Sequence, residues 1–255
     1  MRSPLRFSPS PDSPNLFARK EERRVTHWTT ALGEPPATHG ERLAGFDGVT
    51  LRHFDPGRSK LAAGLANGWE GPLPTSGERW LYLGAAAGTT TSHVADMVGA
   101  GGVVYAMERS LRPFLRLLTL SERYPNILPV LGDARRPLDY LGSVPPVDGV
   151  YVDVAQPDQV ELALDNARTF LVSGGRLLLA LKTASMGRSR NAPEHLASAT
   201  SALGNGFDLF RPVDLAPFHR RHYLLGGEAT RALFREPAGT PAGARPTDRR
   251  AARRS

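Results

Sequence analysis

Residues 79–108 read RWLYLGAAAGTTTSHVADMVGAGGVVYAME, and this stretch decides the fold. The apolar run Trp80–Leu83 predicts a short buried strand that ends in a turn of small residues. Apolar residues recur at helical spacing over residues 91–98, and Gly102–Met107 predicts a second strand. This succession of strand, small-residue turn, helix and strand is typical of a parallel, doubly wound sheet.

The alternation of strands and helices continues through the rest of the core. Helices are predicted around Phe114–Leu118 and over Asp158–Leu171, the second of them stopped by Gly174 and Gly175. The further predicted strands are Ile127–Leu131, Val147–Val152 and Leu177–Lys182, with a hairpin-like sheet edge near Phe207–Phe210 and Tyr223–Leu225. We therefore expect an α/β, Rossmann-like fold whose mostly parallel sheet binds its ligand at the carboxyl ends of the strands.

Composition divides the 255-residue chain into four parts. Residues 1–24, rich in proline and serine, predict a disordered or loosely attached tail, and residues 235–255 predict a second, basic tail. Residues 25–55 predict a small N-terminal β appendage, which leaves residues 56–234 for the core domain. The first tail has six basic and three acidic residues and the second has six and two, so the tails hold the net charge of +7. This excess favours a polyanionic partner weakly, because solvated tails alone also explain it.

Composition also limits the kind of site that the chain can form. There is no cysteine, so disulfides and thiolate metal sites are excluded. The seven histidines show no metal-ligand spacing, and we expect no metal. No apolar run reaches membrane-spanning length and the N-terminus has no apolar signal segment, so we expect an intracellular protein.

Lysine is rare in this chain. Only Lys20, Lys60 and Lys182 are lysines among the 32 basic residues. A buried lysine can give up its proton whereas arginine cannot, so a lysine kept among arginines is a candidate for proton transfer. Lys20 lies in a charged run, but Lys60 and Lys182 lie in the two most motif-like stretches of the core. Arginine-rich codon usage, with a few lysines remaining by chance, would give the same pattern.

Small or polar groups follow three consecutive predicted strands. The turn Gly84–Thr90 lets the backbone approach a ligand, and the helix after it supplies free amides. Glu108 closes the second strand about twenty residues on, where such folds bind ribose hydroxyls. Asp133 follows the third strand and can accept a hydrogen bond from adenine, although an Asx turn explains it nearly as well. Together they favour an adenosine-type cofactor, S-adenosylmethionine or NAD, and the absence of G-x-G-x-x-G lowers the dinucleotide interpretation.

Asp153 ends a predicted buried strand, so its charge requires a partner. The next strand delivers Lys182 to the same edge of the sheet, where the two groups could tune a proton acceptor or form a structural ion pair. Asp158 and Gln159 follow Pro157 and are expected to start a helix.

Five motifs follow one another in the core: LYLGAAAGTTTSHVADMVG, VYAMERS, GDARRP, VDVAQPDQ and LALKTAS. Upstream, PGRSKLAA begins at Pro56. In this order they resemble the motifs of fibrillarin, the family of box C/D RNA-guided 2′-O-methyltransferases, from about Gly40 to Gly226. The upstream stretch matches the family's N-P-x-R-S-K-L-A-A, with Asp55 in place of asparagine. The resemblance implies the Rossmann-like fold of class I S-adenosylmethionine-dependent methyltransferases.

The resemblance also implies two sets of site residues. The contacts that it implies for S-adenosylmethionine are Thr89, Thr90, Glu108, Arg109, Asp133, Ala134, Asp153, Val154, Ala155 and Gln156, to which the turn residue Gly84 is added. The catalytic group that it implies is Lys60, Asp153, Lys182 and His222. Both core lysines are in this group. Arg221 stands before the histidine where the family usually has an acidic residue.

On this resemblance we expect methyl transfer from S-adenosylmethionine to a ribose 2′-hydroxyl in pre-rRNA or tRNA. Lys182 would be the general base or proton relay, and Asp153 would orient it. Lys60 would hold the target nucleotide or stabilise negative charge, with His222 as an auxiliary.

The core has no evident RNA-reading module, so a guide RNA and companion proteins would choose the target. The implied partners are box C/D guide RNA, target rRNA or tRNA, a Nop5-type scaffold and an L7Ae-type kink-turn-binding protein. Because the Gly-Arg-rich arm of the eukaryotic nucleolar form is absent, we expect the cytoplasm of an archaeal cell. The alternatives are a guide-independent methyltransferase acting on protein or other RNA, and a non-catalytic assembly subunit. A nicotinamide oxidoreductase is the least favoured.

Overall fold

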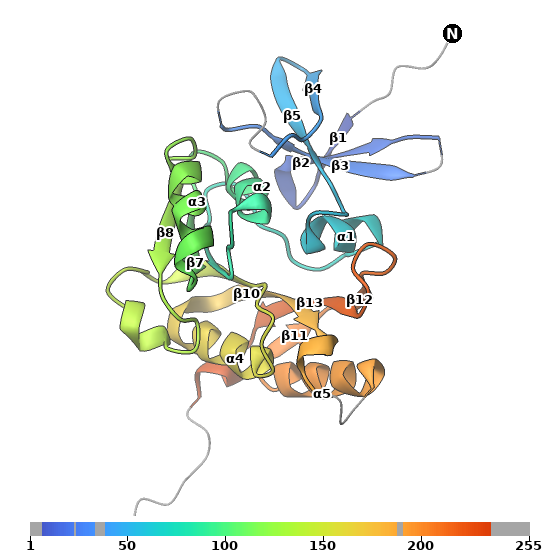
Figure 1. Ribbon diagram of the computed structural model, residues 1–255. Coiled ribbons are helices and arrows are strands. Elements are labelled where there is room, and N and C mark those ends of the chain that lie inside the picture. The colour runs from blue at the N-terminus through green and yellow to red at the C-terminus, as the bar shows by residue number, and fades with distance from the viewer. Residues whose placement is uncertain (1–6, 23, 34–38, 188–190, 236–255) are drawn as a thin grey trace, which may run out of the picture.

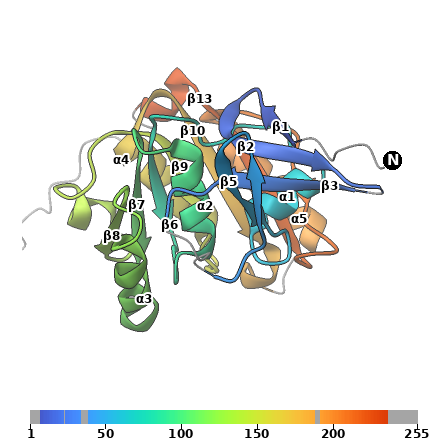
Figure 2. The ribbon, with the colours of Figure 1, turned by 90° about the horizontal axis from the view of Figure 1, so that it is seen from above.

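The computed structural model describes residues 7–22, 24–33, 39–187 and 191–235. These residues form a large mixed sheet with helices on both faces and a smaller N-terminal sheet (Figure 1). The smaller sheet lies over the helices that cover one face of the large sheet, and Figure 2 shows it above α1 and α2. The α/β fold with an N-terminal β appendage is therefore confirmed.

The large sheet has the strand order β11-β13-β10-β9-β6-β7-β8, with β12 paired to β13. The strands are β6 Arg79–Leu83, β7 Val103–Glu108, β8 Ile127–Leu131, β9 Val147–Val152, β10 Leu171–Lys182, β11 Phe207–Leu209, β12 Val213–Asp214 and β13 His222–Ala229. Neighbours from β10 to β8 are parallel, whereas β13 is antiparallel to β10, β11 and β12. The strand order reverses between β6 and β9, which is where sheets of this type bind ligands.

Alternation along the central strands supplies two separate cores. Trp80 and Tyr82 of β6 join the core beneath helices α1, α2 and α3, whereas Leu81 and Leu83 join the core beneath α4 and α5. The α-helices are α1 Lys60–Ala66, α2 Thr89–Val98, α3 Leu111–Ser121, α4 Gln159–Phe170 and α5 Ala192–Gly204, and short 3-10 helices lie at Pro137–Tyr140, Thr183–Ser185 and Arg231–Phe234. The site is thus built on a sheet that is buried on both faces.

The structure confirms the predicted core strands and corrects two details. Helix α4 ends at Phe170, and β10 already begins at Leu171. Gly174 and Gly175 lie inside β10, where the pairing with β9 shifts register, so they form an irregularity of the strand instead of a helix stop. The predicted hairpin-like edge exists as the antiparallel pair β11 and β13, but β13 lies inside the sheet, between β11 and β10.

The N-terminal sheet is larger than the predicted appendage. Its strands, in the spatial order β1-β2-β3-β5-β4, are β1 Phe7–Ser10, β2 Ser13–Lys20, β3 Val25–Thr30, β5 Val49–Phe54 and β4 Leu43–Phe46, all antiparallel to their neighbours. The prediction of a loose tail over residues 1–24 is therefore wrong for the two strands β1 and β2.

Buried contacts tie β2 to the core domain. Leu16 is 2 % exposed and joins the core beneath α1–α3, and Ser13 Oγ donates to the Pro74 carbonyl at 2.7 Å. The proline-rich and serine-rich composition concealed these anchors. Residues 1–6 and 236–255 of the predicted tails lie outside the described residues.

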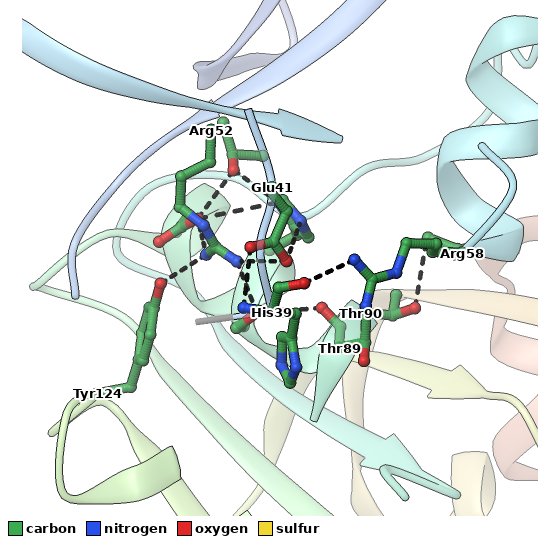
Figure 3. Close-up of polar contacts among 12 residues, drawn as sticks. His39, Glu41, Arg52, Arg58, Thr89, Thr90 and Tyr124 are labelled. Carbon is green, nitrogen blue, oxygen red and sulfur yellow. Dashed lines mark hydrogen bonds and ion pairs between the residues drawn. The ribbon is translucent and has the colours of Figure 1, made fainter. Parts of the chain in front are cut away.

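A buried group of polar side chains joins the N-terminal sheet to α2 (Figure 3). Arg52 of β5 is 1 % exposed, and its Nη1 donates to Asp96 Oδ2 of α2 at 2.7 Å and to the Tyr124 hydroxyl. Its Nη2 pairs with Glu41 at 3.3 Å. Burial raises the pKa of Asp96 to about 6, although Arg52 opposes that rise. We call Arg52, Asp96, Glu41 and Tyr124 the Arg52 network.

Candidate active site

A cavity of about 260 Å³ opens at the carboxyl ends of the central strands, beside the point where the strand order reverses. The segments after β6, β7, β8 and β9 all contribute to its wall. The lining residues are Gly84, Ala86, Met107, Glu108, Arg109, Ser110, Gly132, Asp133, Ala134, Asp153, Val154, Ala155, Gln156 and Leu162. All of the predicted cofactor residues except Thr89 and Thr90 are in this set.

Gly84 lets the turn after β6 lie against the end of β9. Its φ is 85°, in the left-handed region, and a Cβ at this position would lie 2.5 Å from the Asp153 carbonyl oxygen. Its N–H donates to the Met107 carbonyl at 3.0 Å. Only glycine satisfies both the backbone angle and the close approach, so this residue keeps three strand ends together around the cavity.

Glu108 places a carboxylate on the cavity wall at the end of β7, where it is 8 % exposed. Its Oε2 accepts from the Ala86 amide at 3.0 Å, and its Oε1 accepts from the Ser110 amide at 2.7 Å. Each carboxylate oxygen has two lone pairs, so both can accept a further hydrogen bond. These two acceptor oxygens fit the two adjacent hydroxyls of a ribose, which would donate to them.

Asp133 forms the predicted Asx turn and also lines the cavity, so the adenine contact stays a prediction. Its Oδ1 accepts from the Arg135 amide at 3.1 Å, as in an Asx turn, and the residue also lines the cavity. Arg109 Nη1 lies 3.9 Å from its Oδ2. The turn therefore uses one oxygen of the carboxylate and leaves lone pairs of the other for a ligand.

Arg135 fastens the segment after β9 to the segment after β8. Its Nη2 donates to Gln156 Oε1 at 2.7 Å, and it makes a bidentate contact with Asp158 at 2.7 and 3.0 Å. The hydrogen bonds from Arg135 lower the pKa of Asp158. Val154 and Ala155, which also line the cavity, belong to the segment held in this way.

Thr89 and Thr90 begin α2 but lie outside the cavity lining. The Thr90 side chain is buried, and its Oγ1 lies 3.1 Å from Ser59 Oγ (Figure 3). The Thr89 carbonyl accepts from Ser92 Oγ at 3.0 Å. These two threonines are therefore separate from the other predicted cofactor residues, and the Thr90 hydroxyl contacts the segment that carries Lys60.

Lys60 and Asp153 form an ion pair. Lys60 Nζ lies 2.8 Å from Asp153 Oδ1 and 3.0 Å from Oδ2, and the two side chains are 25 % and 13 % exposed. Lys60 is the first residue of α1, whose N-cap Ser59 accepts from the Ala62 amide at 3.4 Å. Because Asp153 also lines the cavity, the ion pair adjoins it.

Lys182 lies on the strand beside β9 but does not pair with Asp153 as expected. Leu179 of β10 faces Val152 of β9, so Asp153 is level with Ala180, two residues before Lys182. Two residues of strand correspond to about 7 Å. No ion pair of the Lys182 ammonium is found among the described residues. The expected ion pair between Lys182 and Asp153 therefore does not form, because the register of β9 and β10 sets the two residues apart.

His222 begins β13 directly opposite Lys182 on β10. Its Nδ1 lies 2.9 Å from the Arg220 carbonyl. A carbonyl only accepts, so this nitrogen carries the proton and Nε2 is left as the acceptor of the neutral ring. Burial lowers the pKa of His222, and the positive charges of Lys60 and Lys182 lower it further. His222 is therefore neutral at pH 7.

Backbone contacts fix the position of Arg221, the residue before His222. Its φ is 60°, and its carbonyl accepts from both the amide and the hydroxyl of Thr183, at 3.1 and 3.0 Å. These contacts join the end of β10 to the start of β13, where His222 begins the strand.

Sequence reasoning missed two residues that hold the site. Gln159, expected only to start α4, is fully buried, and its amide donates to the Lys182 carbonyl at 3.1 Å while accepting from the Lys182 N–H at 2.9 Å. His219 lies with its ring centroid 5.9 Å from that of His222, and its Nε2 is 3.0 Å from the Pro56 carbonyl. A buried polar residue at a helix start was the available signal for Gln159; His219 had none, because its contact is distant in sequence.

Within the described ranges, no group of three or more histidine, aspartate or glutamate side chains is arranged to hold a metal ion. None of the helices described combines the length and hydropathy that a membrane span requires.

Comparison with known proteins gives consistent matches. The family model described as Fibrillarin matches residues 8–231, which extends the resemblance into the N-terminal sheet. The chain is 42 % identical over 209 residues to the fibrillarin-like rRNA/tRNA 2′-O-methyltransferase of Methanopyrus kandleri, covering 82 % of this chain and 90 % of that protein.

Two solved structures are similar over most of their length. The crystal structure of Aeropyrum pernix fibrillarin with natively bound S-adenosyl-L-methionine has a TM-score of 0.76 at 34 % identity, covering 88 % of this chain and 98 % of that one. A fibrillarin/Nop5p complex has a TM-score of 0.73 at 36 % identity, covering 83 % and 97 %. With its sheet order, its cavity and these matches in agreement, the chain belongs to the fibrillarin family.

Proposed function

We propose that this chain is an S-adenosylmethionine-dependent methyltransferase that acts on the ribose 2′-hydroxyl of rRNA and tRNA. One observation carries the proposal: Asp153 lines the cavity and also holds Lys60 at 2.8 Å. A cofactor site and a charged catalytic pair thus share a residue. The rRNA/tRNA 2′-O-methyltransferase name of the Methanopyrus kandleri relative supports the substrate class.

The residues around the cavity fit S-adenosylmethionine. The free lone pairs of Glu108 suit the ribose hydroxyls of its adenosyl part, and those of Asp133 suit the adenine amino group. Residues 153–156 would complete the contacts. When bound, the cofactor supplies a methyl group on a positively charged sulfur, which is already activated for transfer. The protein's part is alignment and proton removal.

The geometry suggests a division of roles. Lys60, fixed by Asp153, would stabilise the negative charge that develops on the attacking 2′-oxygen. Lys182 would relay the proton of the hydroxyl: its ammonium releases one proton to solvent, and the amine that remains takes up the hydroxyl proton. No carboxylate holds this group among the described residues. His222, neutral and opposite Lys182, would be the auxiliary acceptor. Asp153 thus orients Lys60 in this scheme, where the sequence had suggested Lys182.

The proposed setting is a box C/D ribonucleoprotein in the cytoplasm of an archaeal cell. The fibrillarin/Nop5p complex supports a Nop5-type scaffold as partner. Box C/D guide RNA, target rRNA or tRNA and an L7Ae-type kink-turn-binding protein complete the particle that family membership implies. The archaeal source of the Methanopyrus kandleri relative supports the setting.

The test is transfer of labelled methyl to guide-matched RNA in the reconstituted particle. We expect Lys182→Arg to lower the rate by about 10²- to 10⁴-fold, because arginine keeps the charge and cannot accept the proton. Lys20→Arg, the same substitution at an exposed position of β2, is the matched control and should be as active as wild type.

Three outcomes would contradict parts of the proposal. Full activity of Lys182→Arg removes Lys182 from the proton-transfer role. Labelling of RNA or protein without guide and scaffold supports a guide-independent methyltransferase. Failure of the wild type to bind S-adenosylmethionine in calorimetry supports a non-catalytic assembly subunit.

A further inference from the structure

A buried tyrosine contacts Asp153, the carboxylate of the Lys60–Asp153 ion pair. Tyr82 of β6 is 2 % exposed, and its hydroxyl donates to Asp153 Oδ2 at 3.4 Å. Burial, with the neighbouring Tyr151 and Asp153, raises the pKa of Tyr82 well above its ordinary value. The phenol therefore stays protonated and acts as a donor to the carboxylate. A tyrosine in this apolar strand requires such a partner for its hydroxyl.

A second contact reaches the same pair from the helix that follows the cofactor turn. Thr90 lies in the first turn of α2, and its Oγ1 is 3.1 Å from Ser59 Oγ. Ser59 is 2 % exposed, caps α1 and directly precedes Lys60. The Thr90 and Ser59 hydroxyls thus connect α2 to the N-cap of the helix that begins at Lys60.

The two sets of contacts act on opposite members of the ion pair. The Tyr82 hydroxyl contacts Asp153, whereas the Thr90 and Ser59 hydroxyls contact each other at the N-cap of α1, directly before Lys60. A hydroxyl both donates and accepts, whereas a carboxylate only accepts, so Asp153 fixes the direction in which the Tyr82 proton points. None of the three hydroxyl residues lines the cavity, so they act on the site through other groups.

We propose that Tyr82, Thr90 and Ser59 are positioning residues that hold Lys60 and Asp153 in register with the cofactor turn. The inference rests on the methyl-transfer function proposed above for its kinetic consequence, but the geometric claim stands apart from it. Three separate segments, β6, α1 and α2, carry these contacts, so a change in any one would shift the ammonium of Lys60 relative to the transferred methyl group. Misplacement on this scale reduces rate more than binding.

The first test needs no RNA. The chain has three lysines, so protein labelled with ¹³C and ¹⁵N in lysine gives a short set of side-chain signals, with Lys60 assigned by Lys60→Arg. We expect Tyr82→Phe to move the Lys60 signals toward those of exposed Lys20. Tyr151→Phe is the matched control: Tyr151 is equally buried, its ring centroid lies 4.6 Å from that of Tyr82, and no hydrogen bond joins its hydroxyl to Asp153 in the described chain. Unchanged Lys60 signals in Tyr82→Phe would overturn the proposal.

The second test measures the kinetic consequence in the assembled particle. We expect Tyr82→Phe to lower kcat about tenfold while KM for S-adenosylmethionine changes less than about twofold, with Tyr151→Phe near wild type. Ser59→Ala should also lower kcat, and the double variant should lose less than the product of the two losses, because both act on one ion pair. Multiplicative losses, or equal effects of the two phenylalanine variants, would overturn the positioning role.

Two controls distinguish a positioning effect from a failure to fold and from a failure of the proposed function. Thermal unfolding of each variant identifies any that fails to fold, and kcat is compared below the lowest midpoint. If the wild type fails to label RNA, the proposed function is wrong. The Lys60 signals in Tyr82→Phe still decide whether Tyr82 positions the ion pair.

Discussion

Asp153 serves two parts of the site at once, since it lines the cavity and holds Lys60. The sequence identified this residue correctly as a carboxylate at the end of a buried strand that needs a cationic partner. It suggested Lys182 as that partner because the two strands are neighbours. The register, which sets Lys182 about two residues beyond Asp153, is decided by pairing across the sheet and cannot be read from either strand alone.

Asp153→Asn tests this carboxylate with little change of size. Without its charge, Lys60 loses its fixed position, and we expect the single-turnover rate at saturating S-adenosylmethionine to fall about a hundredfold. Asp165→Asn is the control, because Asp165 makes an exposed ion pair with Arg168 on α4. Equal rates for the two variants would show that the ion pair has no role in the reaction.

The elements of the core were predictable because each central strand carries a continuous apolar run between turn residues. Ile127–Leu131 and Val147–Val152 have the predicted bounds. Helix α5 was missed because its segment, rich in alanine and serine, carries only a weak apolar pattern. Strand β2 was missed because Pro14 and two serine-proline pairs nearby suggested disorder, although tertiary contacts hold the strand.

At the level of the turns, Gly84→Ala should destabilise the packing of the turn after β6 against the end of β9. A left-handed alanine costs about 1–2 kcal/mol, and the close contact with the Asp153 carbonyl adds about 1–3 kcal/mol. Gly68→Ala isolates the first cost, because Gly68 has a φ of 87° and nothing within 4 Å of an added Cβ. Urea unfolding and calorimetry with S-adenosylmethionine measure both. Equal destabilisation with unchanged affinity in Gly84→Ala would contradict the close packing described here.

In the whole molecule, the N-terminal sheet and the core domain share a buried charged contact, the Arg52 network. Its members come from β5, α2, the segment before β4 and the segment after α3, which lie far apart in the sequence. Composition predicted an appendage here but not this contact, because a buried arginine is recognised only when its carboxylates are found. The network makes the sheet an integral part of the fold.

Arg52→Leu should therefore destabilise the entire protein. Removing the guanidinium leaves Asp96 buried without its cation, which costs about 3–5 kcal/mol. Arg168→Leu removes an exposed partner of Asp165 on α4, and we expect a change of less than about 1 kcal/mol. Urea unfolding followed by circular dichroism measures both. A small loss for Arg52→Leu would show that the two sheets hold together without this charge.

Acid should destabilise the protein before the exposed carboxylates titrate. Burial lowers the pKa in the fold of six of the seven histidines: His27, to about 4, His39, His53, His93, His219 and His222. Below their ordinary pKa the unfolded chain binds more protons than the folded one, so stability falls as the pH falls. Asp96, with its pKa raised to about 6, acts in the opposite direction but is one group against six.

We expect the melting temperature to fall by about 5 °C between pH 7.5 and pH 5, as measured by calorimetry. His27→Gln removes one of the titrating groups and should reduce this dependence. A melting temperature that stays constant or rises on acidification would contradict the lowered pKa values of these imidazoles in the fold.

The last strand of the described chain, β13, is inserted between β10 and β11 and carries His222 at its first position. The ribosome synthesises the chain from its N-terminus, so the strands around the cavity emerge before β13. Until β13 follows, the edge of β10 from Arg176 to Lys182 has no neighbouring strand. At about 5–20 residues per second, the nascent chain spends seconds in this open-edged state. Nascent chains that stall before β13 would therefore expose the unpaired edge of β10, a template on which such chains associate.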